Sequence, residues 1–172
     1  MGMPMDRDRA LLRHFLGAIA YRTQKALRDA PAHYPTFSAG NRVRTPTELI
    51  RHMSSLLGYV RTFFEGGTYK AEPLPTFDKE VERFHGLLDA VGRLLASGVK
   101  CSIATEQLLQ GPFADAMTHV GQLAMLRRLA DSPVAPENFI YADIRADRLH
   151  ADQPPPARPD KLWPEAPDPR AH

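Results

Sequence analysis

The chain has 172 residues, a hydrophobic fraction of 43%, and 22 lysines and arginines against 20 aspartates and glutamates. That length suffices for one domain with a continuous core, and the near balance of charge argues against a nucleic-acid-binding protein. The single cysteine, Cys101, excludes an internal disulfide framework and is typical of a protein from a reducing compartment.

Residues 1–6 form a short arm that lacks the apolar core of a secretory signal peptide. No apolar run in the sequence approaches the roughly 18 residues that a membrane-spanning helix needs. The sequence therefore predicts a soluble, cytoplasmic protein without a membrane partner.

The first predicted helix runs from about Asp8 to Asp29, because apolar residues recur there at steps of three and four. The segment from Ala30 to Arg44 is predicted to be a loop. Its Tyr34 and Phe37 are too large and apolar for a free linker, so we expect them to fold over one end of the helices. The apolar stripe of the first helix consists of Leu12, Phe15, Leu16, Ile19, Thr23 and Ala26.

The second predicted helix begins at Thr45-Pro46-Thr47-Glu48, which has the form of a capping box with proline at the first helical position, and it ends at Gly66-Gly67. His52 lies within its apolar stripe, where a solvated histidine is not expected. Two interpretations stay open. His52 is either a core histidine bonded to a neighbour, or a metal ligand or acid–base group.

The third predicted helix runs from about Thr76 to Ser97. His85 borders its apolar stripe, and we expect a rim residue there rather than a ligand. After a separate helical turn at about Thr105–Gln110, Gly111-Pro112 is predicted to break or kink the chain.

The fourth predicted helix runs from about Pro112 to Ala130. Asp115 and His119 are four residues apart, so they project from nearly the same face, and Gln122 lies along the same edge. Gly121 costs up to about 1 kcal/mol inside a helix, which predicts a close helix contact at that position.

Residues 136–150 are predicted to cover the helices as a short fifth helix or an irregular segment, held by Phe139, Ile140, Tyr141, Ile144 and Leu149. From Ala151 onward prolines dominate, so this tail is either disordered or an extended arm anchored by Trp163. The prediction is an all-α, antiparallel four-helix bundle over residues 1–150, followed by a Pro-rich C-terminal tail over residues 151–172.

Bundles place metal sites between facing helices, and the second and fourth helices offer His52, Asp115 and His119. Two imidazoles and a carboxylate leave coordination positions open for water or substrate, which is typical of a catalytic site. The donor set suits zinc, nickel or ferrous iron.

Two segments resemble the DinB/YfiT-like superfamily of metalloenzymes. The segment His119-Val-Gly-Gln122-Leu123 resembles a His-x-Gly-Gln-Leu signature on the last bundle helix, and residues 45–52 resemble the entry to the second helix. The resemblance covers about Leu11 to Ala130. It implies a bundle of up-down-down-up type and a divalent metal held by one histidine on the second helix and two on the last.

By this resemblance His52 and His119 take two ligand positions, and Asp115 stands where the family usually has the third histidine. Members of the superfamily include thiol-dependent S-transferases and a thiol-dependent isomerase. The resemblance therefore implies a metal-dependent enzyme, an S-transferase or a hydrolase, that acts on a small molecule with a low-molecular-weight thiol as cosubstrate. Tyr59, Arg61, Gln122 and Tyr141 are candidate substrate contacts.

A second hypothesis is a non-catalytic bundle in which His52, Asp115 and His119 form a buried hydrogen-bonded network that sets helix register. The protein would then be a dimeric scaffold or a small-molecule-binding protein. Under either hypothesis we expect a homodimer.

Overall fold

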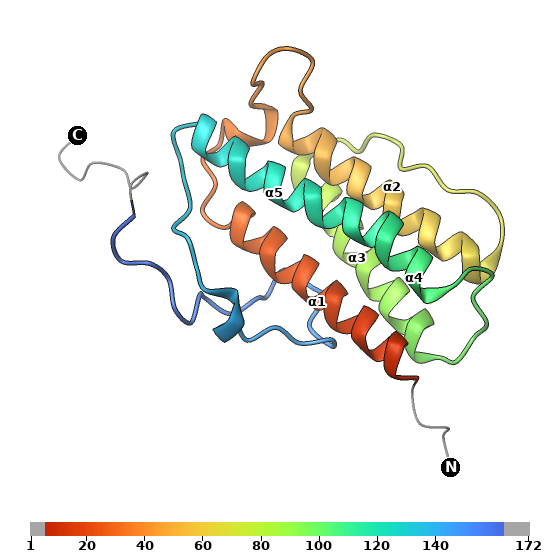
Figure 1. Ribbon diagram of the computed structural model, residues 1–172. Coiled ribbons are helices and arrows are strands. Elements are labelled where there is room, and N and C mark those ends of the chain that lie inside the picture. The colour runs from red at the N-terminus through yellow and green to blue at the C-terminus, as the bar shows by residue number, and fades with distance from the viewer. Residues whose placement is uncertain (1–5, 164–172) are drawn as a thin grey trace.

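The computed structural model describes residues 6–163, so the arm up to residue 5 and the tail beyond 163 lie outside it. The four long helices are α1 (Arg7–Leu27), α2 (Pro46–Glu65), α3 (Phe77–Ala96) and α5 (Ala114–Leu129), with a short α4 (Thr105–Leu108) before the last (Figure 1). Over residues 6–163 the regular elements are all helices, so the all-α prediction is confirmed there. None of the helices in this range has the length and apolar character needed to cross a membrane.

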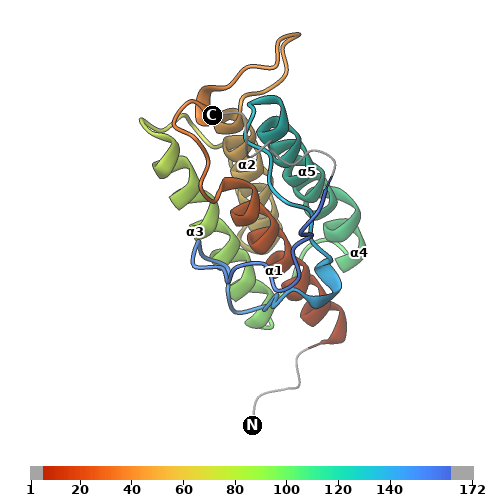
Figure 2. The same ribbon diagram turned by 90° about the vertical axis from the view of Figure 1, so that its left-hand side faces the viewer.

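The long helices pack in a ring in the order α1, α3, α2, α5, around one apolar core (Figures 1 and 2). Arg127 near the end of α5 donates to the carbonyl of Ala26 near the end of α1, so these two helices run in the same direction. Arg9 at the start of α1 donates to Val99 just after α3, so α1 and α3 run in opposite directions.

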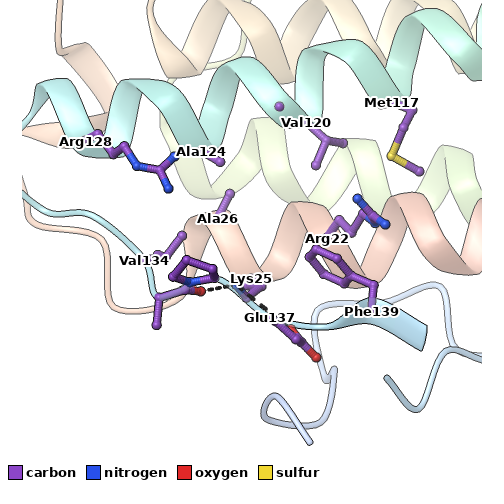
Figure 3. Close-up of a pocket in the computed structure, with 13 residues that line it drawn as sticks. Arg22, Lys25, Ala26, Met117, Val120, Ala124, Arg128, Val134, Glu137 and Phe139 are labelled. Carbon is purple, nitrogen blue, oxygen red and sulfur yellow. Dashed lines mark hydrogen bonds and ion pairs between the residues drawn. The ribbon is translucent and has the colours of Figure 1, made fainter. Parts of the chain in front are cut away.

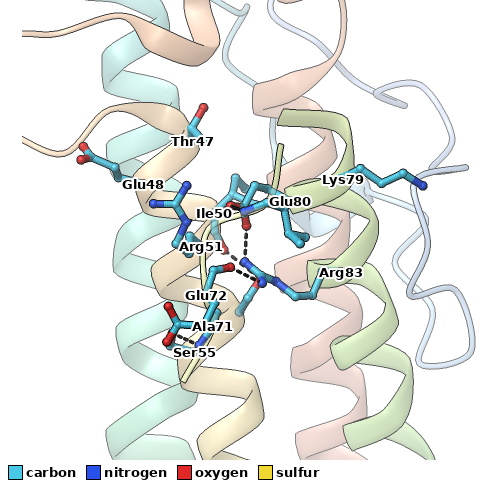
Figure 4. Close-up of polar contacts among 12 residues, drawn as sticks. Thr47, Glu48, Ile50, Arg51, Ser55, Ala71, Glu72, Lys79, Glu80 and Arg83 are labelled. Carbon is cyan, nitrogen blue, oxygen red and sulfur yellow. Dashed lines mark hydrogen bonds and ion pairs between the residues drawn. The ribbon is translucent and has the colours of Figure 1, made fainter. Parts of the chain in front are cut away.

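Glu80, at the start of α3, has no solvent-exposed side-chain surface and holds α3 beside α2 (Figure 4). Its Oε1 accepts hydrogen bonds of 2.8 Å from Arg51 Nε and from the backbone N–H of Leu74, and its Oε2 pairs with Arg83. Because Arg51 lies in the second turn of α2, this buried ion pair shows that α2 and α3 run parallel. The connection over residues 66–76 therefore returns along the length of the bundle.

The predicted capping box at the start of α2 is confirmed. Thr45 Oγ1 accepts a hydrogen bond of 3.3 Å from the backbone N–H of Glu48, and Glu48 Oε2 accepts one of 2.8 Å from the N–H of Thr45. The predicted break between the last two helical segments is also found. Gly111 has φ −94° and ψ −105°, inside a wide turn over Leu109–Phe113 that joins α4 to α5. The kink follows because Pro112 lacks the N–H that a regular helix would use.

The predicted close contact at Gly121 is wrong, since a Cβ placed there would have no neighbouring heavy atom within 4 Å. The close approaches occur at other glycines. A Cβ on Gly58 would lie 1.9 Å from the ring of Tyr69, and one on Gly17 would lie 2.5 Å from the carbonyl oxygen of Arg145. Gly17 therefore admits the backbone of the C-terminal segment onto α1.

The segment over residues 136–150 covers the bundle irregularly, with a short 3₁₀ helix at Phe139–Tyr141. Leu149 is buried as predicted, but Ile140 and Tyr141 are 86% and 51% exposed, so the prediction that they hold the segment is wrong. The tail continues along the bundle to residue 163. There Arg28, just after α1, donates to the carbonyls of Gln153 and Pro154 at 2.7 and 3.2 Å, while Trp163 is only half-buried.

His85 is not the rim residue that the stripe predicted. The C-terminal segment crosses it, leaves it 4% exposed, and places the carbonyl of Leu149 2.8 Å from its Nδ1. Nδ1 must carry the proton, because a carbonyl can only accept. The other ring nitrogen, Nε2, is buried without a hydrogen-bond partner in the described part of the chain. The folded protein therefore holds this imidazole in its neutral form.

Burial lowers the pKa of His85 below its ordinary value, although its hydrogen bond to Leu149 opposes the shift. As the pH falls below about 6.5, the unfolded chain takes up this proton before the folded chain does, so stability is lost with falling pH, at up to about 1.4 kcal/mol per pH unit. We expect the wild type to lose more stability than His85→Gln between pH 7.5 and 5.5, as measured by urea unfolding. Equal losses would contradict this prediction.

Candidate metal centre

The three predicted ligands come together between α2 and α5. His52, Asp115 and His119 each offer one ligand atom, and these atoms lie within 4.8 Å of one another. Nε2 of His119 lies 3.2 Å from Asp115 Oδ1, and Nε2 of His52 lies 3.8 Å from Asp115 Oδ2. The two imidazole rings meet edge to face, with centroids 4.7 Å apart.

One ring nitrogen of His119 lacks a hydrogen-bond partner within the range that the structure describes. Its Nδ1 lies 2.7 Å from Oε1 of Gln122, so the proton is on Nδ1 and the lone pair is on Nε2. That Nε2 is buried and has no hydrogen-bond partner among the residues described, yet it faces a carboxylate oxygen. Two acceptors this close repel each other unless a proton or a cation lies between them. A metal ion bound by both atoms, or a proton on Nε2, would each remove that repulsion.

His52 is also prepared to donate a lone pair. Burial lowers its pKa below the ordinary value and the positive charge of Arg44 lowers it further, while Asp115 raises it. The net shift keeps the imidazole neutral near pH 7, which is the form that binds a metal.

The residues fit a small divalent ion. An ion about 2.0–2.2 Å from each ligand atom in tetrahedral geometry separates those atoms by about 3.4 Å. The contacts of the two Asp115 oxygens, 3.2 and 3.8 Å, are near that separation, and the cluster as a whole, within 4.8 Å, would contract slightly around an ion. The Asp115 side chain is 46% exposed and that of His52 is 30% exposed, so one side of the cluster is open to solvent. An open side is typical of a catalytic rather than a structural site.

Local structure explains how the cluster forms. The capping box fixes where α2 begins, and His52 follows in the second turn. The kink at Gly111 starts α5 at Ala114, which places Asp115 in its first turn and His119 one turn later. The fully buried Tyr34, predicted to fold over the helices, donates a 2.7 Å hydrogen bond to the Leu123 carbonyl and so ties the loop to α5.

A pocket of about 450 Å³ adjoins the cluster. Gln122, the hydrogen-bond partner of His119, is one of the residues that line it. Sequence reasoning missed its two cationic residues, Arg42 and Arg44, because a loop has no periodicity that assigns its side chains to a face. Arg42 has φ +62°, an uncommon backbone conformation for a residue other than glycine. The lining consists of Arg42, Val43, Arg44, Leu49, Gln122, Met125 and Leu126.

Of the predicted substrate contacts, only Gln122 touches the cluster. Arg61 pairs with Glu65 one turn along α2, and the ring of Tyr59 packs on Phe63. Tyr141 lies under the guanidinium of Arg158, 4.3 Å from its ring centroid.

Comparison with known proteins adds no assignment: no family model, no curated protein and no solved structure matches the chain.

Proposed function

We propose that this protein is a divalent-metal-dependent enzyme of the DinB/YfiT-like type, with His52, Asp115 and His119 as its metal ligands. The observation that carries the proposal is the buried, unpartnered Nε2 of His119, which faces the carboxylate of Asp115 at 3.2 Å. A network built only to set helix register would instead carry a proton on that nitrogen, donated to Asp115, and metal content separates the two.

The helix directions support the same proposal. α1 and α5 run one way, while α2 and α3 run the other, which is the up-down-down-up order that the resemblance implies. One ligand comes from the second long helix and two come from the last, again as the resemblance implies. The substitution of aspartate for the third histidine keeps three ligands, since a carboxylate binds zinc and ferrous iron.

The chemistry proposed is S-transfer with a low-molecular-weight thiol, or hydrolysis, at a zinc, nickel or ferrous ion. A bound divalent ion would stabilise the deprotonated form of a thiol or water at neutral pH. The exposed side of Asp115 and His52 leaves room for that group. Arg42 and Arg44, in the adjoining pocket, would bind and orient a substrate that carries an anionic group.

The first test is metal content. We expect protein purified without a histidine tag to bind about one equivalent of zinc or nickel, and we expect His52→Ala to bind little, as measured by elemental analysis after dialysis. His85→Ala serves as the matched control, because His85 is also a buried histidine but lies outside the cluster. Wild-type protein that takes up no metal on titration would overturn the proposal.

The second test separates an enzyme from a metal-bound scaffold. Cobalt-loaded protein is titrated with a small thiol, and direct thiolate ligation is expected to add a charge-transfer absorption band that the His52→Ala variant lacks. Metal uptake without this band would contradict the thiol-dependent reaction. The homodimer stays a prediction.

A further inference from the structure

A second cavity, of about 280 Å³, lies between α1, α5 and the segment over residues 134–139 (Figure 3). Met117, Val120 and Ala124 form its α5 wall. These positions are on the face of α5 opposite to Asp115 and His119, because they differ from them by about half a helical turn. The cavity is therefore separate from the metal centre.

The cavity contains more positive than negative charge. Arg22 and Lys25 of α1 and Arg128 of α5 line it, against one carboxylate, Glu137. That carboxylate is engaged at one oxygen, since its Oε1 accepts a 2.6 Å hydrogen bond from the Tyr21 hydroxyl. Its buried Oε2 has no hydrogen-bond partner within residues 6–163 and lies 4.0 Å from Lys25 Nζ.

Arg22 is attracted by the charge of Glu137, but no hydrogen bond or close ion pair joins the two within residues 6–163. Its guanidinium carbon lies 3.7 Å from the ring centroid of Phe139, and the guanidinium points toward α5 (Figure 3). Its Nε is buried and has no hydrogen-bond partner within residues 6–163. Partial burial of the guanidinium removes solvation that the charge of Glu137 offsets only in part, so this position favours a further anion from outside the chain.

Gly121 adds an independent observation. It lines the cavity, and a Cβ there would meet no heavy atom within 4 Å. Glycine costs about 1 kcal/mol relative to alanine inside a helix, and here no neighbouring helix requires it. Because glycine has no side chain, it leaves open volume beside the apolar wall formed by Met117, Val120 and Ala124.

We propose that this cavity is a binding site for a small organic carboxylate with an apolar body. The apolar body lies along the wall of α5 beside Gly121, and the carboxylate pairs with the guanidinium of Arg22. Lys25 and Arg128 add to the positive field at the entrance.

Octanoate is a suitable probe, with octan-1-ol as the neutral control of the same chain length. Both are titrated into metal-free protein and followed by amide chemical shifts. We expect octanoate to bind at least ten times more tightly than octan-1-ol, with shifts centred on residues 120–124 and 134–139. His52→Ala is expected to bind octanoate as the wild type does, which separates this site from carboxylate binding at the metal centre.

Two variants test the residues. Gly121→Leu is expected to abolish octanoate binding by filling the cavity, whereas Gly86→Leu is the matched control, because it is also a helical glycine with open space around its Cβ. Arg22→Met is expected to weaken octanoate binding at least tenfold while leaving octan-1-ol binding within twofold. Equal affinity for octanoate and octan-1-ol, or unchanged octanoate binding by Gly121→Leu, would overturn the proposal.

Discussion

Replacing Arg127 with methionine is expected to lower the free energy of unfolding by about 3–5 kcal/mol, because several buried carbonyls would lose their donor. Arg127 is 3% exposed and joins α5 to the end of α1. Its Nη1 donates to the carbonyls of Ala26 and Arg28, at 2.8 and 2.9 Å, and its Nε donates to Ser132 at 2.7 Å. A methionine fills similar volume but satisfies none of these acceptors.

Urea unfolding measures this loss of stability, and two further variants serve as comparisons. Arg127→Lys keeps the charge but cannot reach several carbonyls at once, so it should lose most of the same stability. Arg128→Met changes the neighbouring, exposed arginine and should stay within about 1 kcal/mol of the wild type. A loss of less than 1 kcal/mol for Arg127→Met would show that water replaces its bonds.

Replacing Gln122 with leucine is expected to weaken metal binding 10- to 100-fold, without removing any ligand. Gln122 Oε1 accepts the proton of His119 Nδ1 and thereby keeps the lone pair on Nε2, toward Asp115. Partners that orient a metal-binding histidine in this way typically contribute about 10- to 100-fold to affinity. Competition with a chromophoric zinc chelator measures the change.

Gln122→Glu is the matched control for that experiment. A glutamate at this position keeps an oxygen acceptor for Nδ1 and makes it stronger, so affinity should be retained or increased. If the leucine variant binds metal as tightly as the wild type, then Gln122 does not orient His119.

The two candidate sites share α5 and use opposite faces of it. His119 and Gln122 belong to the face toward α2, while Gly121 and Ala124 belong to the face toward α1. Both proposals therefore depend on one helix, yet each has variants that leave the other site intact. His52→Ala acts on the metal centre alone, and Gly121→Leu acts on the second cavity alone.

The sequence by itself determined features that depend on neighbours along the chain. The capping box of Thr45 and Glu48, the kink at Gly111 and the pairing of Asp115 with His119 all arise within a few residues, where helix geometry fixes positions. The apolar stripes likewise predicted which face of each helix is buried. His52 could be singled out because a histidine inside such a stripe needs a partner.

Only the tertiary structure decided which distant groups meet. The contact of His52 with Asp115, the burial of His85 under Leu149 and the burial of Arg127 against the end of α1 each join segments far apart in the chain. The predicted helix contact at Gly121 was wrong for the same reason. The free-energy cost of a glycine in a helix depends on its own helix, whereas the groups that face it depend on how the helices pack. Periodicity describes one helix at a time, whereas these contacts depend on the order, direction and spacing of the packed helices.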